Sequence, residues 1–521
     1  MDRKETFGEL IRFGIVGTTA AAIHYAVYWI LQHWIEVNIA YTIGYIVSFF
    51  VNYYLSAHFT FKAKTSARNG IGFGGAHLFN YLLHMVLFNV FLWLGLSREL
   101  APIAVLAIAV PTNFIIVRLV FKKLSPHTLS IIHHPSSIVI GFDAKRIVKN
   151  ATGLGSYSRT LINDLARQNI TLRLYAPDKG RDDLREQIVK QDNVSFCYPH
   201  ASSHRQSRFF TLHSSLFTSY WRSRGIVRDL LHDGVQLYHG LSGELPIGLR
   251  KSGIKSVVTI HDLIFLRHPE YYHWLDTKIY AWKFRRTLRE ADHIIAISEC
   301  TKRDIIEYGH VDPSRISVIY QSYAPRFGVA NSTLYPLHSK YILSVGSIEA
   351  RKNILLAIKA LPLLPEDLSL VIVGRHTKYT DLVTDYIKTH QLEHRVKILH
   401  GVTDDELPAL YAGAEAFVYP SRYEGFGIPI IEAISSGLPV VACTGSCLEE
   451  AGGPDSLYVD PDDVEGMSAA IRQCLKGAEG RNERISRSRE YIRRFEGSDV
   501  ASQVISLYQR LLKNAQTSED Y

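Results

Sequence analysis

Cysteine is scarce in this chain of 521 residues, and its five copies are scattered. They are Cys197, Cys300, Cys443, Cys447 and Cys474, and no two of them form a Cys-x-x-Cys pair. Cys443 and Cys447 lie close together but lack a second pair, which argues against a zinc site. Scattered thiols also argue against a disulfide framework, so the composition fits a reducing compartment.

Acidic residues are outnumbered, because 50 Asp and Glu residues stand against 58 Lys and Arg residues. The net charge is +8 and the isoelectric point is about 9.0. Such an excess suits a membrane surface, an anionic substrate or nucleic acid, and does not choose among them. The length exceeds that of one ordinary domain, so we expect two or three.

The first 125 residues contain apolar runs at 13–31, 39–59, 76–96 and 101–121. Each run is close to the ~20 residues that a helix needs to span a bilayer. A cleaved signal peptide would account for the first run only, and no small-residue cleavage site follows it. We therefore predict an α-helical membrane domain of four transmembrane helices over residues 1–125.

Positively charged residues are concentrated in the segments that would lie on one side of the membrane. Lys and Arg precede the first run, separate the second from the third and follow the fourth, whereas Arg98 is the only cation in the two opposite loops. The positive-inside rule then places both termini in the cytoplasm. We expect a multi-pass protein of the inner membrane, with everything after Phe121 cytoplasmic.

Polar residues interrupt the runs. Asn52 and Asn113 each precede a Phe-Lys pair in a span that runs inward, which indicates a parallel repeat of two hairpins. With His24 and His84, they could line a path for lipid headgroups, but we favour hydrogen bonds between helices. Residues 7–123 resemble the GtrA-like family of four-span proteins linked to polyprenyl-phosphate sugars, which implies translocation or presentation of a lipid-linked sugar.

Residues 126–137 hold two prolines and no helical period, so we interpret them as a linker. Beyond it, apolar strands alternate with helical segments, which indicates doubly wound parallel sheets. We predict two α/β halves, 138–335 and 336–521. The clearest strands are 138–142, 257–262 and 293–298 in the first half, and 341–346, 370–374, 396–401 and 417–419 in the second.

A glycine-broken loop follows the strand at 417–419 and opens a short helix, 429–436. The amides of Phe426, Gly427 and Ile428 would point at the space before this helix, which favours a bound phosphate or diphosphate. Glu424 and Glu432 bracket the turn and could accept hydrogen bonds from sugar or ribose hydroxyls. Alone, the pattern is also compatible with a surface turn carrying two chance glutamates.

The first half offers two further candidates. Gly153 and Gly155 stand before a predicted helix, 157–168, and would let the backbone approach an anionic ligand. His261 ends a buried strand, where parallel sheets place their chemistry, although a His that only caps a loop would look the same. Ser298 is a predicted helix N-cap.

The second half offers a pair of cations. Arg351 and Lys352 follow the strand at 341–346 and could neutralise a leaving diphosphate, or could be a solvated pair. The string Asp460-Pro461-Asp462 has the form of a metal-binding motif, but an N-capping turn before a helix from Val464 is the better interpretation.

The stretch Glu424 to Glu432, with its GFGIP filling, resembles the signature of retaining GT-B glycosyltransferases of family 4 (group 1). His261-Asp262, the RKN at 351–353 and the GLG at 153–155 match further motifs, with Ser156 where the family usually has Arg. The resemblance covers 138–512. It implies two Rossmann-like domains facing a cleft, with a last helix that crosses back to the first.

The resemblance also implies roles. Donor binding would involve Gly153, Gly155, Gly346, Gly374, Arg375, Val402, Phe426, Gly427, Ile428 and Glu432, with the base near Gly374, Arg375 and Val402 and the ribose on Glu432. The catalytic residues would be His261, Arg351, Lys352 and Glu424. Neither a metal nor another cofactor is expected.

Two stretches, 205–228 and 271–289, combine basic and aromatic residues. They suit membrane headgroups better than RNA in a chain with a membrane module, although an amphipathic helix with a solvated basic face is the simpler alternative. We expect a membrane-bound retaining glycosyltransferase that uses a nucleoside-diphosphate sugar and a polyprenyl-linked glycan or glycolipid acceptor, and that binds no nucleic acid. The alternatives are a lipid-linked sugar translocase that senses sugar nucleotide, and a sugar-nucleotide epimerase.

Overall fold

The computed structural model describes residues 3–31, 34–35, 37–60, 138–199, 218–323, 326–328 and 340–516, with scattered positions between 73 and 117. The chain divides into two compact units, Met1–Ile132 and His133–Tyr521. This division falls inside the predicted linker. The predicted boundary between the two α/β halves, at residue 335, lies outside the described residues.

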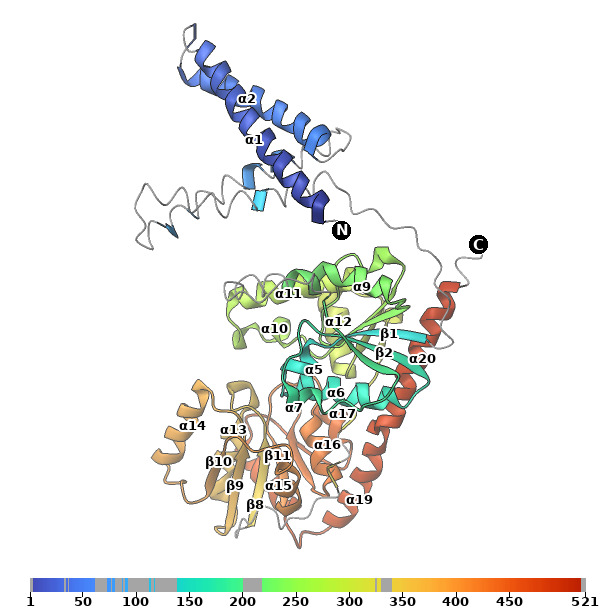
Figure 1. The fold of residues 1–521 in the computed structure, drawn as a ribbon. Coiled ribbons are helices and arrows are strands. Elements are labelled where there is room, and N and C mark those ends of the chain that lie inside the picture. The colour runs from blue at the N-terminus through green and yellow to red at the C-terminus, as the bar shows by residue number, and fades with distance from the viewer. Residues whose placement is uncertain are drawn as a thin grey trace. The chain divides into compact units, whose positions relative to one another are not determined.

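The first unit contains α1 (Arg3–Leu31) and α2 (Val37–Leu55), which pack against each other, and a π-helical turn, Ser56–Thr60 (Figure 1). No helix in the part of the chain that the structure describes is both long and apolar enough to cross a bilayer. The predicted third and fourth spans lie largely outside the described residues.

Asn52 is one of the four polar residues predicted to bond between helices. It accepts a hydrogen bond from Ser56 one turn along, with Oγ and Oδ1 3.1 Å apart, and its bond between helices stays a prediction. Oδ1 of Asn113 is buried and has no partner among the described residues. His84 and the side chain of His24 lie outside the described residues.

The first half of the second unit is a seven-stranded parallel sheet in the order β3-β2-β1-β4-β5-β6-β7. Its strands are β1 (Ile138–Asp143), β2 (Ile170–Tyr175), β3 (Val194–Cys197), β4 (Leu237–Gly240), β5 (Lys255–Ile260), β6 (His293–Ala296) and β7 (Ile316–Val318). Its helices are α5 (Lys145–Lys149), α6 (Gly153–Ala166), α7 (Asp182–Arg185), α9 (Ile226–His232), α10 (Ile264–Arg267), α11 (Trp274–Glu290) and α12 (Glu299–Gly309). Short turns of other helix types are Trp221–Gly225, Arg250–Ser252, Pro269–Tyr271 and Pro313–Arg315.

Both faces of this sheet are buried, which is why its strands are apolar throughout. Ile140 and Phe142 of β1 pack in the same cluster as Leu161 and Leu165 of α6, whereas Val139 points to the cluster on the opposite face. Successive side chains of a strand alternate in this way.

The helix predicted over 157–168 is α6, which begins earlier, at Gly153, and ends at Ala166. The sequence argument placed Gly153 and Gly155 in a loop, but both occupy the first helical turn. A Cβ on Gly155 would lie 1.7 Å from the carbonyl oxygen of Asn150, so only glycine allows the chain to turn directly from α5 into α6. Gly155 therefore has a packing reason that is independent of any ligand.

The second half is a six-stranded parallel sheet in the order β10-β9-β8-β11-β12-β13. Its strands are β8 (Lys340–Val345), β9 (Leu368–Val373), β10 (Val396–Leu399), β11 (Ala416–Tyr419), β12 (Val440–Cys443) and β13 (Leu457–Val459). Its helices are α13 (Ile354–Ala360), α14 (Lys378–Thr389), α15 (Leu407–Gly413), α16 (Ile428–Ser435), α17 (Leu448–Gly452), α18 (Val464–Cys474) and α19 (Arg481–Ile492). Short 3-10 turns are Ala350–Lys352, Leu361–Leu363 and Arg493–Phe495.

The last helix, α20 (Gly497–Gln516), leaves the second half and packs on α6 of the first (Figure 1). Val504, Leu507 and Tyr508 of α20 are buried in the core of the first half. The two halves are thus joined by shared hydrophobic packing as well as by the chain.

The strand order reverses between β1 and β4 in one sheet and between β8 and β11 in the other. Open parallel sheets bind ligands at the carboxyl ends of the strands beside such a reversal, because neighbouring loops there turn to opposite faces. The loops after β8 and β11 carry six of the fourteen predicted site residues, among them Arg351, Lys352 and Glu424.

Candidate active site

The loop after β8 positions two cations. It passes through Gly346 and forms the 3-10 turn Ala350–Lys352, which presents Arg351 and Lys352. Asn353 ends the turn in the left-handed region, with φ of 53°, and its side-chain amide donates to the carbonyl of Pro461 at 2.8 Å. α13 begins directly afterwards, so the cations sit on a short rigid segment between a strand and a helix.

The loop after β11 positions a carboxylate. Ser421 donates a 2.5 Å hydrogen bond to Oε1 of Glu424, and the hydroxyl of Tyr419 lies 3.3 Å from the same oxygen. Gly427, at the start of α16, has φ of 132°, and a Cβ there would lie 3.2 Å from both Leu448 and Ala451. Glycine is therefore required at the turn that connects Glu424 to the helix.

Arg351, Lys352 and Glu424 come together as one buried cluster. Nη1 of Arg351 lies 3.0 Å from Oε2 of Glu424, and Nζ of Lys352 pairs with Oε1. Lys352 also donates to the hydroxyl of Tyr419 at 2.7 Å. The three charged side chains are only 15%, 16% and 11% exposed, respectively.

The charges in this cluster stabilise one another. Burial acts to raise the pKa of Glu424, but Lys352 and Arg351 outweigh it and lower the pKa to about 2. Burial acts to lower the pKa of Lys352, and Glu424 raises it above its ordinary value. Arg351, Lys352 and Glu424 carry one net positive charge between them at neutral pH, and the carboxyl group of Glu349 lies 3.9 Å from Arg351 at the edge of the cluster. The two fixed cations suit an anionic ligand.

Backbone amides adjoin this cluster at the N-terminus of α16. No described residue accepts a hydrogen bond from the amides of Phe426, Gly427 or Ile428. The side chain of Phe426 is buried, with its ring stacked 5.4 Å from that of Tyr320, so this residue can offer a ligand only its backbone. A helix N-terminus next to two cations is a favourable place for phosphate.

Glu432 lies one turn inside α16 and accepts a 3.2 Å hydrogen bond from the hydroxyl of Tyr411. Burial raises the pKa of Glu432 to about 7, and the hydrogen bond from Tyr411 opposes the shift. Its carboxyl group therefore changes charge near neutral pH, unlike that of Glu424.

His261 follows β5, but its ring nitrogens are both engaged by protein. Nε2 lies 2.8 Å from the carbonyl oxygen of Leu241, and Nδ1 lies 2.9 Å from Nε2 of Gln321. Burial lowers the pKa of His261 to about 4, so the ring is neutral, donates to Leu241 and accepts from Gln321. Tyr157 of α6 packs edge-on against it, with ring centroids 4.8 Å apart. For His261 to contact a sugar as predicted, one of its hydrogen bonds to Leu241 and Gln321 would have to break.

The two halves meet at Gly425. Its carbonyl oxygen accepts hydrogen bonds from Ser298 at 2.7 Å and Thr301 at 3.3 Å, both at the start of α12. A Cβ on Gly425 would lie 2.1 Å from the carbonyl oxygen of His261. Ser298 also accepts a bond from the amide of Thr301, which confirms the predicted N-cap.

The remaining predicted donor residues lie around the same sheet edge. Gly346 and Gly374 pack back to back, because a Cβ on Gly374 would lie 2.0 Å from the carbonyl oxygen of Gly346. Arg375 is exposed, and Val402 is partly buried against the core. Gly153 has open space where a side chain would stand. No direct bond from these residues to the charged cluster is present in the described structure, so their donor role stays a prediction.

Sequence reasoning missed several residues that complete the site. Tyr419 and Ser421 hold Glu424, Tyr411 holds Glu432, and Thr301 binds Gly425. Tyr419 was detectable, since it ends β11 beside the strand reversal. The others lie in helices or loops whose contacts depend on the folded chain.

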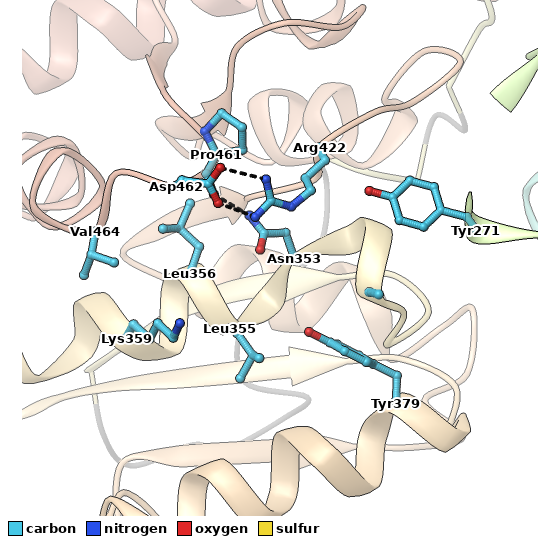
Figure 2. A pocket seen from close by; sticks show the side chains of 11 residues that line it. Tyr271, Asn353, Leu355, Leu356, Lys359, Tyr379, Arg422, Pro461, Asp462 and Val464 are labelled. Atoms are coloured by element: carbon cyan, nitrogen blue, oxygen red, sulfur yellow. Dashed lines mark hydrogen bonds and ion pairs between the residues drawn. The ribbon is translucent and has the colours of Figure 1, made fainter. Parts of the chain in front are cut away.

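A cavity of about 340 Å³ is lined in part by Ala350 and Asn353, the residues on either side of the two cations. Figure 2 shows Tyr271 of the first half facing side chains of the second, among them Lys359, Tyr379 and Arg422. The guanidinium of Arg422 donates to both carboxylate oxygens of Asp462, with Nη1 3.1 Å from Oδ2. This cavity was not predicted from the sequence.

The Asp460-Pro461-Asp462 string forms a turn. Oδ1 of Asp460 accepts the amide of Asp462 at 2.9 Å, and Asp463 caps α18 through the amide of Gly466 at 2.8 Å. Within the described ranges, no three His, Cys, Asp or Glu side chains are grouped to hold a metal ion.

The fold and site are those of a GT-B glycosyltransferase. Family models match residues 151–323 (Glycosyltransferase Family 4), 330–491 (Glycosyl transferases group 1) and 12–121 (GtrA/DPMS, transmembrane domain). O-antigen chain mannosyltransferase B of Escherichia coli is 30% identical, over 69% of this chain and 96% of that protein. The chain therefore belongs to the group 1 glycosyltransferases, here joined to a GtrA-type segment, and both resemblances seen in the sequence are confirmed.

Further similarities are more distant. O-antigen chain mannosyltransferase RfbU of Salmonella typhimurium is 31% identical over 47% of this chain and 67% of that protein. Among solved structures, sucrose-phosphate synthase from Thermosynechococcus elongatus covers 72% of this chain and all of its own, with 20% identity and a TM-score of 0.59. WaaG, a glycosyltransferase involved in lipopolysaccharide biosynthesis, covers 71% of this chain and 99% of its own, with 16% identity and a TM-score of 0.54. These two structures support the fold.

Proposed function

We propose that this protein is a membrane-bound, retaining glycosyltransferase that moves a hexose from a nucleoside-diphosphate sugar to a lipid-linked or cell-envelope glycan at the cytoplasmic face. The names of the relatives make mannose the first sugar to test, since two of them are O-antigen mannosyltransferases. The match to a transmembrane-domain family at 12–121 supports attachment to the membrane.

The buried cluster of Arg351, Lys352 and Glu424 carries this proposal. A donor diphosphate would compete with Glu424 for the two cations, and the amides at 426–428 would add hydrogen bonds to its oxygens. As the bond between the sugar and the diphosphate breaks, negative charge develops on the diphosphate, and fixed cations in a buried site stabilise it strongly. This provides the leaving-group assistance without a metal ion.

Retention of the anomeric configuration is proposed from the resemblance to retaining glycosyltransferases, and the cluster bears on how it would be achieved. Both carboxylate oxygens of Glu424 are held by cations, so Glu424 is a weak candidate for a covalent nucleophile. We therefore propose substitution on one face: the acceptor hydroxyl attacks the anomeric carbon, the sugar–diphosphate bond breaks, and the hydroxyl proton passes to the departing diphosphate. Glu424 would then orient a hydroxyl of the sugar, and Glu432 the ribose.

A second candidate function is translocation of a lipid-linked sugar, with the α/β unit acting as a sensor. The GtrA/DPMS match favours it, because that segment is a family domain of its own. A sugar-nucleotide epimerase is the third, and differs in needing no acceptor.

Nucleotide release from a nucleoside-diphosphate mannose, measured with and without membrane glycolipid, separates these functions. We expect release that depends on the acceptor, and a product whose anomeric configuration, read by NMR, matches that of the donor. Epimerised donor without any acceptor would indicate the epimerase. Glycolipid flipping that survives Lys352→Ala, with no transfer, would indicate the translocase.

A further inference from the structure

Helix α11 presents an unusual outer face. Four large apolar side chains are exposed on it: Trp274 at 62%, Leu275 at 47%, Ile279 at 42% and Trp282 at 59%. Their spacing along the sequence, at positions 274, 275, 279 and 282, places them on one side of a helix. The opposite side of α11 is buried through Ala281, Phe284, Thr287 and Leu288, so the exposed apolar face is not the side that the core uses.

Cations share this face. Lys278, Arg285, Arg286 and Arg289 fall between the apolar positions at helical spacing, and none of them forms an ion pair with a described residue. Two of them lie over the exposed indoles, with Nζ of Lys278 4.9 Å from the ring of Trp274 and the guanidinium of Arg286 5.1 Å from that of Trp282. By contrast, Lys283, nearer the core, is paired with Glu244 at 2.9 Å.

We propose that this face of α11, defined by these eight residues, docks on the surface of a bilayer that contains anionic lipid. Tryptophan and leucine side chains insert at the boundary between headgroups and acyl chains, while Lys and Arg at the same level bind lipid phosphates. A cation held over an indole keeps its charge at the depth of the ring, where the phosphates lie.

The remainder of the chain favours this occupant over others. Residues 12–121 match a transmembrane-domain family, so a membrane surface is always within reach of the tethered α/β unit, and a weak docking site is sufficient. The charge of the face is of one sign, which complements an anionic surface and opposes an identical face on a second copy. The inference does not depend on which sugar is transferred.

Fluorescence of the full-length protein in vesicles tests the docking. Lipids with brominated acyl chains quench indoles that insert among them, and the difference between the wild type and Trp274→Phe/Trp282→Phe isolates the two α11 indoles. We expect this difference signal to be quenched in phosphatidylcholine vesicles containing phosphatidylglycerol, and less so in phosphatidylcholine alone. A matched control adds Leu382→Trp to the double variant, because Leu382 is 51% exposed on α14 of the other half; we expect that indole to stay unquenched.

Charge variants give an independent readout. Lys278→Gln and Arg286→Gln should each weaken the docking equilibrium about fivefold, the effect expected for one basic residue at an anionic surface. Nucleotide binding should stay unchanged, which shows that the variants fold. Absence of quenching at Trp274 and Trp282 in anionic vesicles would overturn the proposal, as would cross-linking between two copies through a cysteine introduced at position 282.

Discussion

The hydroxyl of Ser298, in the first half of the α/β unit, donates a 2.7 Å hydrogen bond to the carbonyl oxygen of Gly425, in the second half. This bond fixes the residue next to Glu424, and the carbonyl of His261 packs against the same glycine. The position of the charged cluster is therefore set by contacts between the halves as well as by its own loop.

Gly425→Ala should lower the turnover rate by about 100-fold, the effect expected when catalytic groups move by about 1 Å. The added Cβ would lie 2.1 Å from the carbonyl oxygen of His261, so the halves or the loop must shift. Steady-state kinetics measures the effect. Gly17→Ala is the control, since no atom of the described residues lies within 4 Å of a Cβ there. Equal turnover of both variants would contradict the role of the Gly425 contact.

Lys352→Met should lower kcat/KM by about 10²–10³-fold, as expected when one preorganised donor to a developing charge is lost. Glu424 would keep Arg351 as a partner, so the chain should still fold. The matched control is Lys359→Met, because Lys359 lines the neighbouring cavity and is outside the charged cluster. If kcat/KM fell equally in the two variants, any positive charge in this region would have the same effect, which would contradict a specific role for Lys352.

Glu432→Gln should remove a pH dependence of nucleotide binding. The pKa of Glu432 is raised to about 7, so its carboxyl is neutral below that pH and ionised above it. The ionised form accepts hydrogen bonds from ribose hydroxyls more strongly, so affinity should rise between about pH 6 and about pH 8 in the wild type and stay flat in the variant. Calorimetric titration with a nucleoside-diphosphate sugar measures this, because its doubly esterified diphosphate does not titrate in this range. Parallel profiles would be contrary to the proposed role of Glu432.

The same carboxyl group links stability to pH. Its pKa in the folded chain lies above its ordinary value of 4.5, so between about 4.5 and 7 the folded chain binds a proton that the unfolded chain has released. Its contribution to the free energy of unfolding is complete below that window and is lost as pH rises through 7. The free energy of unfolding of Glu432→Gln, measured by denaturation at several pH values, should not show this decrease.

Tyr508→Phe should loosen α20. The hydroxyl of Tyr508 lies 2.6 Å from Nδ1 of His239, and Thr259 occupies the other nitrogen at 2.8 Å. Burial lowers the pKa of His239 to about 3, so the neutral ring would be left with one unsatisfied nitrogen. We expect the opening free energy of α20 to fall by about 1–3 kcal/mol, measured by hydrogen exchange. Tyr220→Phe, at a residue that is 52% exposed, should have no such effect.

The sequence could predict the α/β fold because buried parallel strands are apolar and their polar ends lie on one edge. The family resemblance brought Arg351, Lys352 and Glu424 into one prediction, and they meet in the structure because β8 and β11 are neighbours in the sheet. The partners of His261 could not be predicted: Leu241 and Gln321 belong to other loops and have no local pattern. The early start of α6 was missed because its two glycines suggested a loop, whereas Gly155 serves a close turn.

The most direct test of the central claim is transfer of label from donor to lipid. Full-length protein in membranes with native lipid extract would receive labelled UDP-, GDP- and ADP-sugars, with Lys352→Met in parallel. We predict that one donor labels a lipid in the wild type and that the variant abolishes the label. A donor that binds yet labels no lipid, glycan or protein would contradict the glycosyltransferase assignment of the charged cluster.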